Sequence, residues 1–269
     1  MSRSIHRIAT AVAFSLVAGT SAADAQTAVQ IRVTALSPAL GTALTPMWLG
    51  VHDGTFRVFT AGEAASAGLE AIAEDGNTAV LAATFGGAGF TTQHTLLGPS
   101  GGIFLGGQSA THTFMLDAGN PMQRYLSYAS MVVPSNDAFI ATMNPTARDL
   151  TDGMGNFRNF SFVVMGSQVW DSGTEVNDEL ETNTAFFGQT MPNTGVDENG
   201  VVRLHSGFNP GGRILSSDRF RDGDFTQAGY QVVRFDVSVV PEPSTWVMLL
   251  SGLVVIGAMA RRRVGGASA

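Results

Sequence analysis

The chain has 269 residues, contains no Cys and no Lys, and carries a net charge of −7. The two chain ends hold five of its 15 Arg, so residues 26–240 contain ten Arg against twenty Asp plus Glu. This acidity argues against nucleic-acid binding, which needs cationic patches. The missing Cys excludes disulfides, so the fold must depend on core burial or on a metal.

Residues 1–25 have the pattern of a secretory signal peptide. Arg3 and Arg7 precede an uncharged, mostly apolar run at 8–19, and the segment ends on the small residues Ala23 and Ala25. A basic start, a short apolar run and a small-residue exit predict a signal helix that is removed on export. The following residues, 26–239, have the length of one domain.

Strand patterns dominate residues 26–239. Apolar and polar residues alternate in 29–34 and 233–239, and this period of two predicts strands with one buried and one solvated face. The runs 125–133 and 160–165 are more uniformly apolar, as in the central strands of a sandwich. Shorter strands are predicted at residues 56–60, 111–116, 138–142 and 201–205. Together these strands predict an all-β fold, an antiparallel two-sheet β-sandwich.

One segment, residues 62–77, has helical spacing instead. Ala65, Leu69 and Ile72 recur at helical intervals, and Gly76 can end the helix. We expect one short connecting helix that caps an end of the sandwich, and a helix that binds a partner is the alternative. Residues 84–111, rich in Gly and Thr, predict a long hairpin or loop.

Catalytic motifs are weak. Residues 98–102 fit G-x-S-x-G, but a nucleophile elbow needs a strand before the Ser and a helix after it, and Pro99 with the following glycines supplies neither. The His residues lack the H-E-x-x-H spacing of a zinc site; those outside the signal are His52, His94, His112 and His205. We therefore predict a chain that is not an enzyme.

Acidic residues concentrate in 169–181, VWDSGTEVNDELE, which holds five carboxylates. No Arg lies between Arg158 and Arg203 to balance them. The segment is therefore either a solvated loop or a place where acids converge on a cation. A smaller acidic run at 218–224 is interleaved with Arg and predicts a self-neutralised loop.

Three blocks of the chain together resemble the spondin domain, the N-terminal module of F-spondin and mindin that also occurs in bacterial exported proteins. They are residues 51–77, 128–144 and 169–179, with 224–237 closing the domain. The resemblance spans nearly all of 26–239 and implies an antiparallel β-sandwich. This chain lacks the Cys residues and thrombospondin repeats of animal members, so their partners cannot be transferred to it.

The resemblance also implies a calcium site. In the family an Asp and two acids four residues apart bind the ion; here these are Asp137 in PSNDAFIA, and Asp171 and Glu175 in WDSGTE. Calcium takes about 6–8 oxygen ligands, so three carboxylates with loop carbonyls and water would suffice. Animal members usually carry Asp where this chain has Glu175. The alternative is that the three are unrelated surface acids, and the remaining acids of 169–181 are assigned to a solvated rim.

The C-terminal segment, residues 240–269, resembles the PEP-CTERM sorting signal of Gram-negative bacteria. Pro241, Glu242 and Pro243 precede an uncharged stretch that ends at Ala260, and three Arg follow at 261–263. As a helix, the stretch would span roughly 27 Å of a hydrocarbon core about 30 Å thick, and the Arg cluster would stay cytoplasmic. The resemblance implies cleavage near Pro-Glu-Pro by an exosortase; a plain membrane anchor is the alternative.

The leading prediction is an exported, calcium-binding, spondin-type adhesion or matrix module, held transiently in the membrane and processed at the cell envelope by an exosortase. The alternative is a lectin-like sandwich that binds extracellular polysaccharide, with Trp48 and Trp170 as candidate contacts. A third and weaker hypothesis is a hydrolase. A surface protein is the alternative to polysaccharide as the partner, and the sequence pattern favours no particular ligand.

Processing provides the first testable prediction. Because the two signals flank one folded unit, the mature protein should lack residues 1–25 and everything after about Pro243. The intact mass of protein recovered from native cells measures this. Retention of the Arg cluster at 261–263 would make the tail an ordinary membrane anchor.

Overall fold

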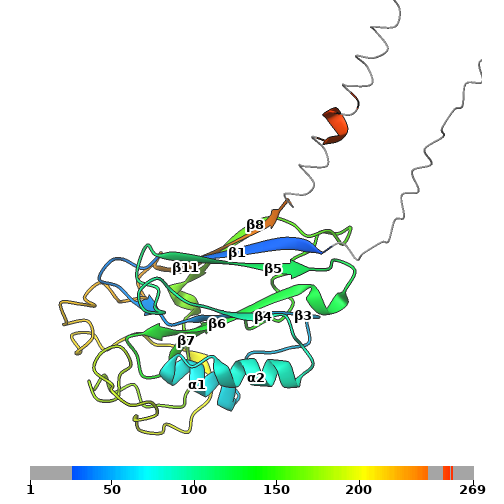
Figure 1. Cartoon of the computed structure of the whole chain (residues 1–269). Helices are drawn as coiled ribbons and strands as arrows, with labels where there is room; N and C mark the ends of the chain where they lie inside the picture. The colour runs from blue at the N-terminus through cyan, green and yellow to red at the C-terminus, as the bar shows by residue number, and fades with distance from the viewer. Residues whose placement is uncertain (1–25, 242–250, 255, 257–269) are drawn as a thin grey trace, which may run out of the picture.

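The computed structural model describes residues 26–241, 251–254 and 256. Within them the chain forms two antiparallel sheets and a helical pair, stacked as three layers (Figure 1). The predicted two-sheet sandwich is confirmed. The signal segment, Glu242, Pro243 and most of the predicted membrane helix lie outside the described residues. No helix within the described ranges is long and apolar enough to cross a membrane.

The first sheet has the strand order β5-β1-β11-β8. Its strands are β1 (Thr27–Ala35), β5 (Ser109–Leu116), β8 (Phe160–Met165) and β11 (Gln231–Val240). The predicted alternation is confirmed, since β1 and β11 pair from Ala28 opposite Val240 to Ala35 opposite Val233. Their inward side chains are buried: Val29, Ile31, Val33, Val233, Phe235 and Val237.

Strand β8 is an edge strand, so the prediction of a central position for residues 160–165 is wrong. Its aromatic rings are only half-buried. The guanidinium of Arg148 lies 4.0 Å from the ring centre of Phe162, and that of Arg158 lies 4.8 Å from the ring centre of Phe160. Such cation–π contacts shield apolar rings at a sheet edge, and the composition of the strand alone does not reveal them.

The second sheet has the order β10-β9-β7-β6-β3-β4, with β2 added beside β6. Its strands are β2 (Ala43–Leu44), β3 (Met47–His52), β4 (Gln93–Leu96), β6 (Tyr125–Val133), β7 (Ala138–Ala141), β9 (Trp170–Asp171) and β10 (Arg203–Leu204). The predicted strand at 138–142 is confirmed, and that at 201–205 shrinks to two residues. Residues 56–60 are not a strand; their Phe56, Val58 and Phe59 are buried in the helical layer's core.

The second sheet is covered on both faces, which explains why β3 and β6 are apolar almost throughout. Leu49 and Val51 of β3 face the core between the sheets, whereas Trp48, which precedes Leu49, packs with the helical layer. Successive side chains of a strand point to opposite faces, so a strand with two packed faces loses its polar positions.

Two helices cover the outer face of this sheet, α1 (Ala67–Asp75) and α2 (Ala79–Gly87) (Figure 1). Short 3-10 turns occur at Pro121–Gln123 and Gly166–Gln168. The prediction of a single helix capping an end of the sandwich is therefore wrong in number and in place. Helix α1 ends at Gly76 as expected, with a left-handed φ of 63°. Helix α2, AVLAATFGG, has no polar face and ends in two glycines, so it lacks the usual helical pattern.

The open edge of the sandwich is closed by a pair of histidines. His94 lies on β4 and His112 on β5, the edge strands of the two sheets. Their rings stack with centroids 3.6 Å apart and planes 10° from parallel. The pair therefore joins β4 and β5, two edge strands whose described residues form no backbone hydrogen bond with each other.

The inter-sheet core makes Phe235 a sensitive position. Its side chain is fully buried, and its ring stacks 4.7 Å from Phe162 and lies 4.6 Å from Tyr128. Phe235→Ala should cost ~3–5 kcal/mol of unfolding free energy, whereas its exposed neighbour Arg234→Ala should stay within about 0.5 kcal/mol. Urea unfolding measures both. A loss below ~1 kcal/mol for Phe235→Ala would place that side chain outside the core.

The histidine pair should make the domain less stable in mild acid. Burial lowers the pKa of His94 and His112 below the ordinary 6.5, so their protonation favours the unfolded chain. Their contribution is complete above pH 6.5 and is lost as the pH falls through the lowered values. His112→Phe should therefore flatten the decline of unfolding free energy below pH 6.5.

Urea titrations at a series of pH values measure this decline. Burial also lowers the pKa values of His52 and His205, to about 4, so these residues contribute the same loss of stability in acid to the wild type and to the variant. An identical pH dependence in the wild type and the variant would contradict a role for the stacked pair.

Candidate metal centre

Adjacent strands bring the two predicted aspartates together. Asp137 immediately precedes β7, Asp171 ends β9, and Ala138 of β7 lies opposite Asp171. The backbone NH of Ser172 also donates to the carbonyl of Asp137, at 3.2 Å. The carboxylates are therefore fixed by sheet register as well as by their own contacts.

The third carboxylate of this group is Glu198. One oxygen each of Asp137, Asp171 and Glu198 lie within 4.8 Å of one another, a spacing that could hold a metal ion. Glu198 reaches this position on a loop whose NH groups at Glu198 and Gly200 donate to the carbonyls of Thr174 and Gly173. No role was predicted for Glu198, because nothing in its local sequence spacing relates it to the loop that follows β9.

Asp137 is fully buried, and its two oxygens differ. Oδ2 accepts hydrogen bonds from the Ser172 hydroxyl at 2.9 Å, from the Thr174 NH at 3.0 Å and from the Glu175 NH at 3.3 Å. Oδ1 has no hydrogen-bond partner. Burial, and then the nearby charge of Asp171, raise the pKa of Asp137. The carboxylate is thus oriented by one oxygen while the other lacks a partner.

Asp171 is buried and better satisfied than Asp137. Its Oδ1 accepts from the Gly173 NH at 2.8 Å, and its Oδ2 accepts from the Asn177 amide and from Arg203, both at 3.0 Å. Arg203 also donates to both oxygens of Glu198, at 2.7 and 2.9 Å. Burial still raises the pKa of Asp171 despite this guanidinium. One Arg therefore pairs with two of the three acids, and the group keeps a formal net negative charge.

Glu175 lies beside this group, on the side of helix α1, and is not one of the three converging carboxylates. Its Oε1 accepts from the Gly195 NH at 3.0 Å, while its buried Oε2 has no partner. A Cβ at position 195 would lie 2.1 Å from the Glu175 carboxyl carbon, so the loop needs glycine there. Burial, and then the charge of Glu74 on α1, raise the pKa of Glu175 to about 8.

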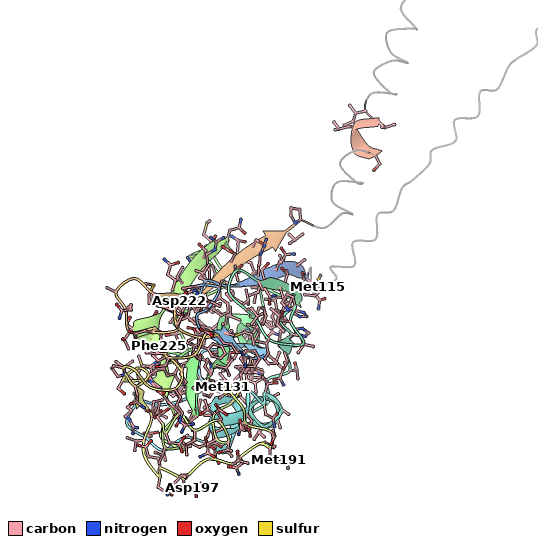
Figure 2. The ribbon with its side chains drawn as sticks, turned by 90° about the vertical axis from the view of Figure 1, so that its left-hand side faces the viewer. Met115, Met131, Met191, Asp197, Asp222 and Phe225 are labelled. Atoms are coloured by element: carbon pink, nitrogen blue, oxygen red, sulfur yellow. The ribbon has the colours of Figure 1, made fainter. Side chains whose placement is uncertain are left out.

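The candidate centre opens to solvent through a neighbouring cavity of about 260 Å³. Asp171, Glu198 and Arg203 form part of its wall, together with Asn177 and His205. Figure 2 shows Asp197, the neighbour of Glu198, at the end of the molecule remote from Met115 of β5. An ion and water can therefore reach the group through this cavity.

The donor set suits a hard cation. It consists of carboxylate oxygens, with His205 in the cavity wall pointing its Nε2 to the Asn177 amide oxygen at 3.3 Å. Within the described residues, only four buried side-chain polar atoms lack a partner, and two of them are Asp137 Oδ1 and Glu175 Oε2. A cation bound by oxygens would supply the missing partner, and oxygen-only ligation favours calcium or magnesium over zinc.

The chain matches a known sorting sequence at its C-terminal end. The PEP-CTERM protein-sorting motif matches residues 239–263, which confirms the predicted signal at Pro241, Glu242 and Pro243. This motif implies an exported protein that is associated with the cell envelope and processed by an exosortase. No curated protein matches the chain. Fold and motif together define an exported β-sandwich protein, and its spondin relationship stays a prediction.

Proposed function

We propose that this protein is a calcium-binding, spondin-type adhesion or matrix module of the cell surface, and not an enzyme. The observation that carries the proposal is the pair of buried carboxylate oxygens without partners, on Asp137 and Glu175. Both residues belong to the calcium triad that the spondin resemblance implies. An unpartnered buried polar atom costs about 1–3 kcal/mol, more if charged, so its persistence at two neighbouring acids indicates a ligand.

A cation explains the hydrogen bonds of Asp137 better than a proton does. Three donors converge on its Oδ2 and favour the ionised form. Oδ1 is then left as an anionic ligand atom. Asp137, Asp171 and Glu198 would hold the ion, Glu175 would lie beside them, and water from the cavity would complete the coordination.

The proposed ion would also brace the fold. Asp137 and Asp171 come from the ends of β7 and β9, Glu198 comes from a later loop, and Glu175 borders Glu74 on α1. Without disulfides, a shared cation is a strong link between these separate segments. Adhesion would follow if an acidic or hydroxyl group of a ligand entered the cavity beside the ion.

One observation also favours the alternative of carbohydrate binding. Trp48 is fully buried and donates its ring NH to Gln93, so it is a core residue. Trp170, in contrast, is half-buried and forms part of the wall of a second cavity. Of these two tryptophans, only Trp170 is placed to contact a sugar.

Calcium should stabilise the protein through this centre. At a concentration 100-fold above Kd, a ligand that binds only the folded state adds about 2.7 kcal/mol, which raises the melting temperature. Asp171→Asn should abolish the rise, because it removes a charged ligand while keeping the side chain's shape. Asp222→Asn, an exposed acid remote from the centre, is the matched control and should leave the rise intact.

Isothermal titration calorimetry measures the binding itself. Glu198→Gln and Glu175→Gln should each weaken calcium binding, and the larger loss identifies the carboxylate nearer the ion. An absence of heat at millimolar calcium, the weak end of extracellular calcium modules, would rule out the site.

A further inference from the structure

A second cavity, of about 250 Å³, lies on the other side of strand β9 from the metal centre's cavity and shares no lining residue with it. Its wall contains Trp170 of β9, Leu204 of β10, and residues of the loop that follows β7 and of the turn before β9. The volume is small for a drug-sized ligand, for which about 300–1,000 Å³ is usual, and suits one ring-sized group.

The charge of this cavity is opposite to that of the rest of the domain. No Asp or Glu contributes to its wall, although acids outnumber Arg two to one in residues 26–240. Arg148 does contribute, and within the described part of the chain it forms no ion pair with a carboxylate. Its guanidinium is held over Phe162, and its buried Nε has no hydrogen-bond partner.

The polar side chains around Arg148 offer further donors. Asn144 uses its amide oxygen to accept from Thr146, and Gln168 uses its amide oxygen to accept from the Met165 NH. The NH2 groups of both amides make no hydrogen bond within the described residues, so they are free to donate. One guanidinium and two amide donors around one cavity match a ligand that is rich in acceptor oxygens and negatively charged.

The apolar part of the wall narrows the choice of anion. Trp170 packs against Phe59 with ring centroids 5.0 Å apart, and Leu204 is 56% exposed at the rim. Aromatic and aliphatic side chains contact the C–H faces of a pyranose ring, whereas acetate or phosphate presents no such face. The combination of an apolar wall, amide donors and one guanidinium without an ion pair among the described residues fits a sugar ring that bears a carboxylate.

We propose that this cavity binds a carboxylated sugar unit, a hexuronate, with Arg148 on the carboxylate, Asn144 and Gln168 on ring hydroxyls, and Trp170 and Leu204 against the ring. This binding is independent of the calcium centre. It gives the domain a second contact for polysaccharide, distinct from any ligand that the ion would hold.

Calorimetry of the full-length chain with a galacturonate trisaccharide tests the proposal, in EDTA so that the calcium centre does not contribute. The trisaccharide should bind, and a neutral glucose trisaccharide should bind at least tenfold more weakly. Monomeric glucuronate shows whether a single unit suffices. Acetate binding as strong as that of the uronates would mean a simple anion site and would overturn the proposal, as would the absence of trisaccharide binding.

Two variants locate the site. Arg148→Gln should weaken binding at least tenfold, since it removes the charge-assisted hydrogen bonds between the guanidinium and the carboxylate. Because Arg148 also packs on Phe162, Leu204→Asp is the second variant; it adds a repelling charge at an exposed position and should weaken binding similarly. Met115→Asp, at a site 45% exposed on β5, is the matched control. Unchanged affinity in Leu204→Asp would contradict the assignment.

Discussion

The candidate centre depends on carboxylates that are buried without enough positive charge to balance them. Asp137, Asp171 and Glu175 are each at most 2% exposed, and Arg203 is the one guanidinium among the described residues that pairs with any of them. Burying ionised carboxylates is costly unless they are paired, hydrogen-bonded or bound to a metal. Sheet register fixes Asp137 and Asp171, and Gly195 admits the Glu175 carboxylate, so the fold holds these acids in place instead of letting them turn to solvent.

The three-layer architecture explains how a chain without disulfides can stay folded despite the free-energy cost of burying these carboxylates. Sheet one packs on sheet two through the core around Phe235, and the helical pair packs on the other face of sheet two around Trp48 and Phe85. The acids lie where strands of sheet two meet helix α1 and the later loops. Ala28 and Val240, near the two ends of the described domain, lie beside Met115, since Ala28 pairs with Val240 and with Met115. Figure 2 shows Met115 and Asp197, the neighbour of Glu198, at opposite ends of the domain, so the candidate centre is remote from Val240.

Much of the fold could be predicted because period-two alternation survives wherever a strand has one wet face, as in β1 and β11. Two predictions failed because the amphipathic pattern is missing. Helix α2 has no polar face, so it was not predicted, and β8 was predicted to be central although it is an edge strand whose aromatic rings are covered by Arg148 and Arg158. Family resemblance pointed to Asp137 and Asp171, which the structure brings together. Glu198 and Arg203 could not be found this way, because they reach the centre through loop and strand pairings more than 20 residues along the chain.

A crystal structure of the protein grown with calcium, compared with one grown in EDTA, tests the calcium centre directly. We expect an ion in the calcium form, bonded to Asp137 Oδ1 at about 2.3–2.6 Å, with oxygens of Asp171 and of Glu198 or Glu175 in its coordination shell. Density for water alone at Asp137 Oδ1 in both crystals would contradict it.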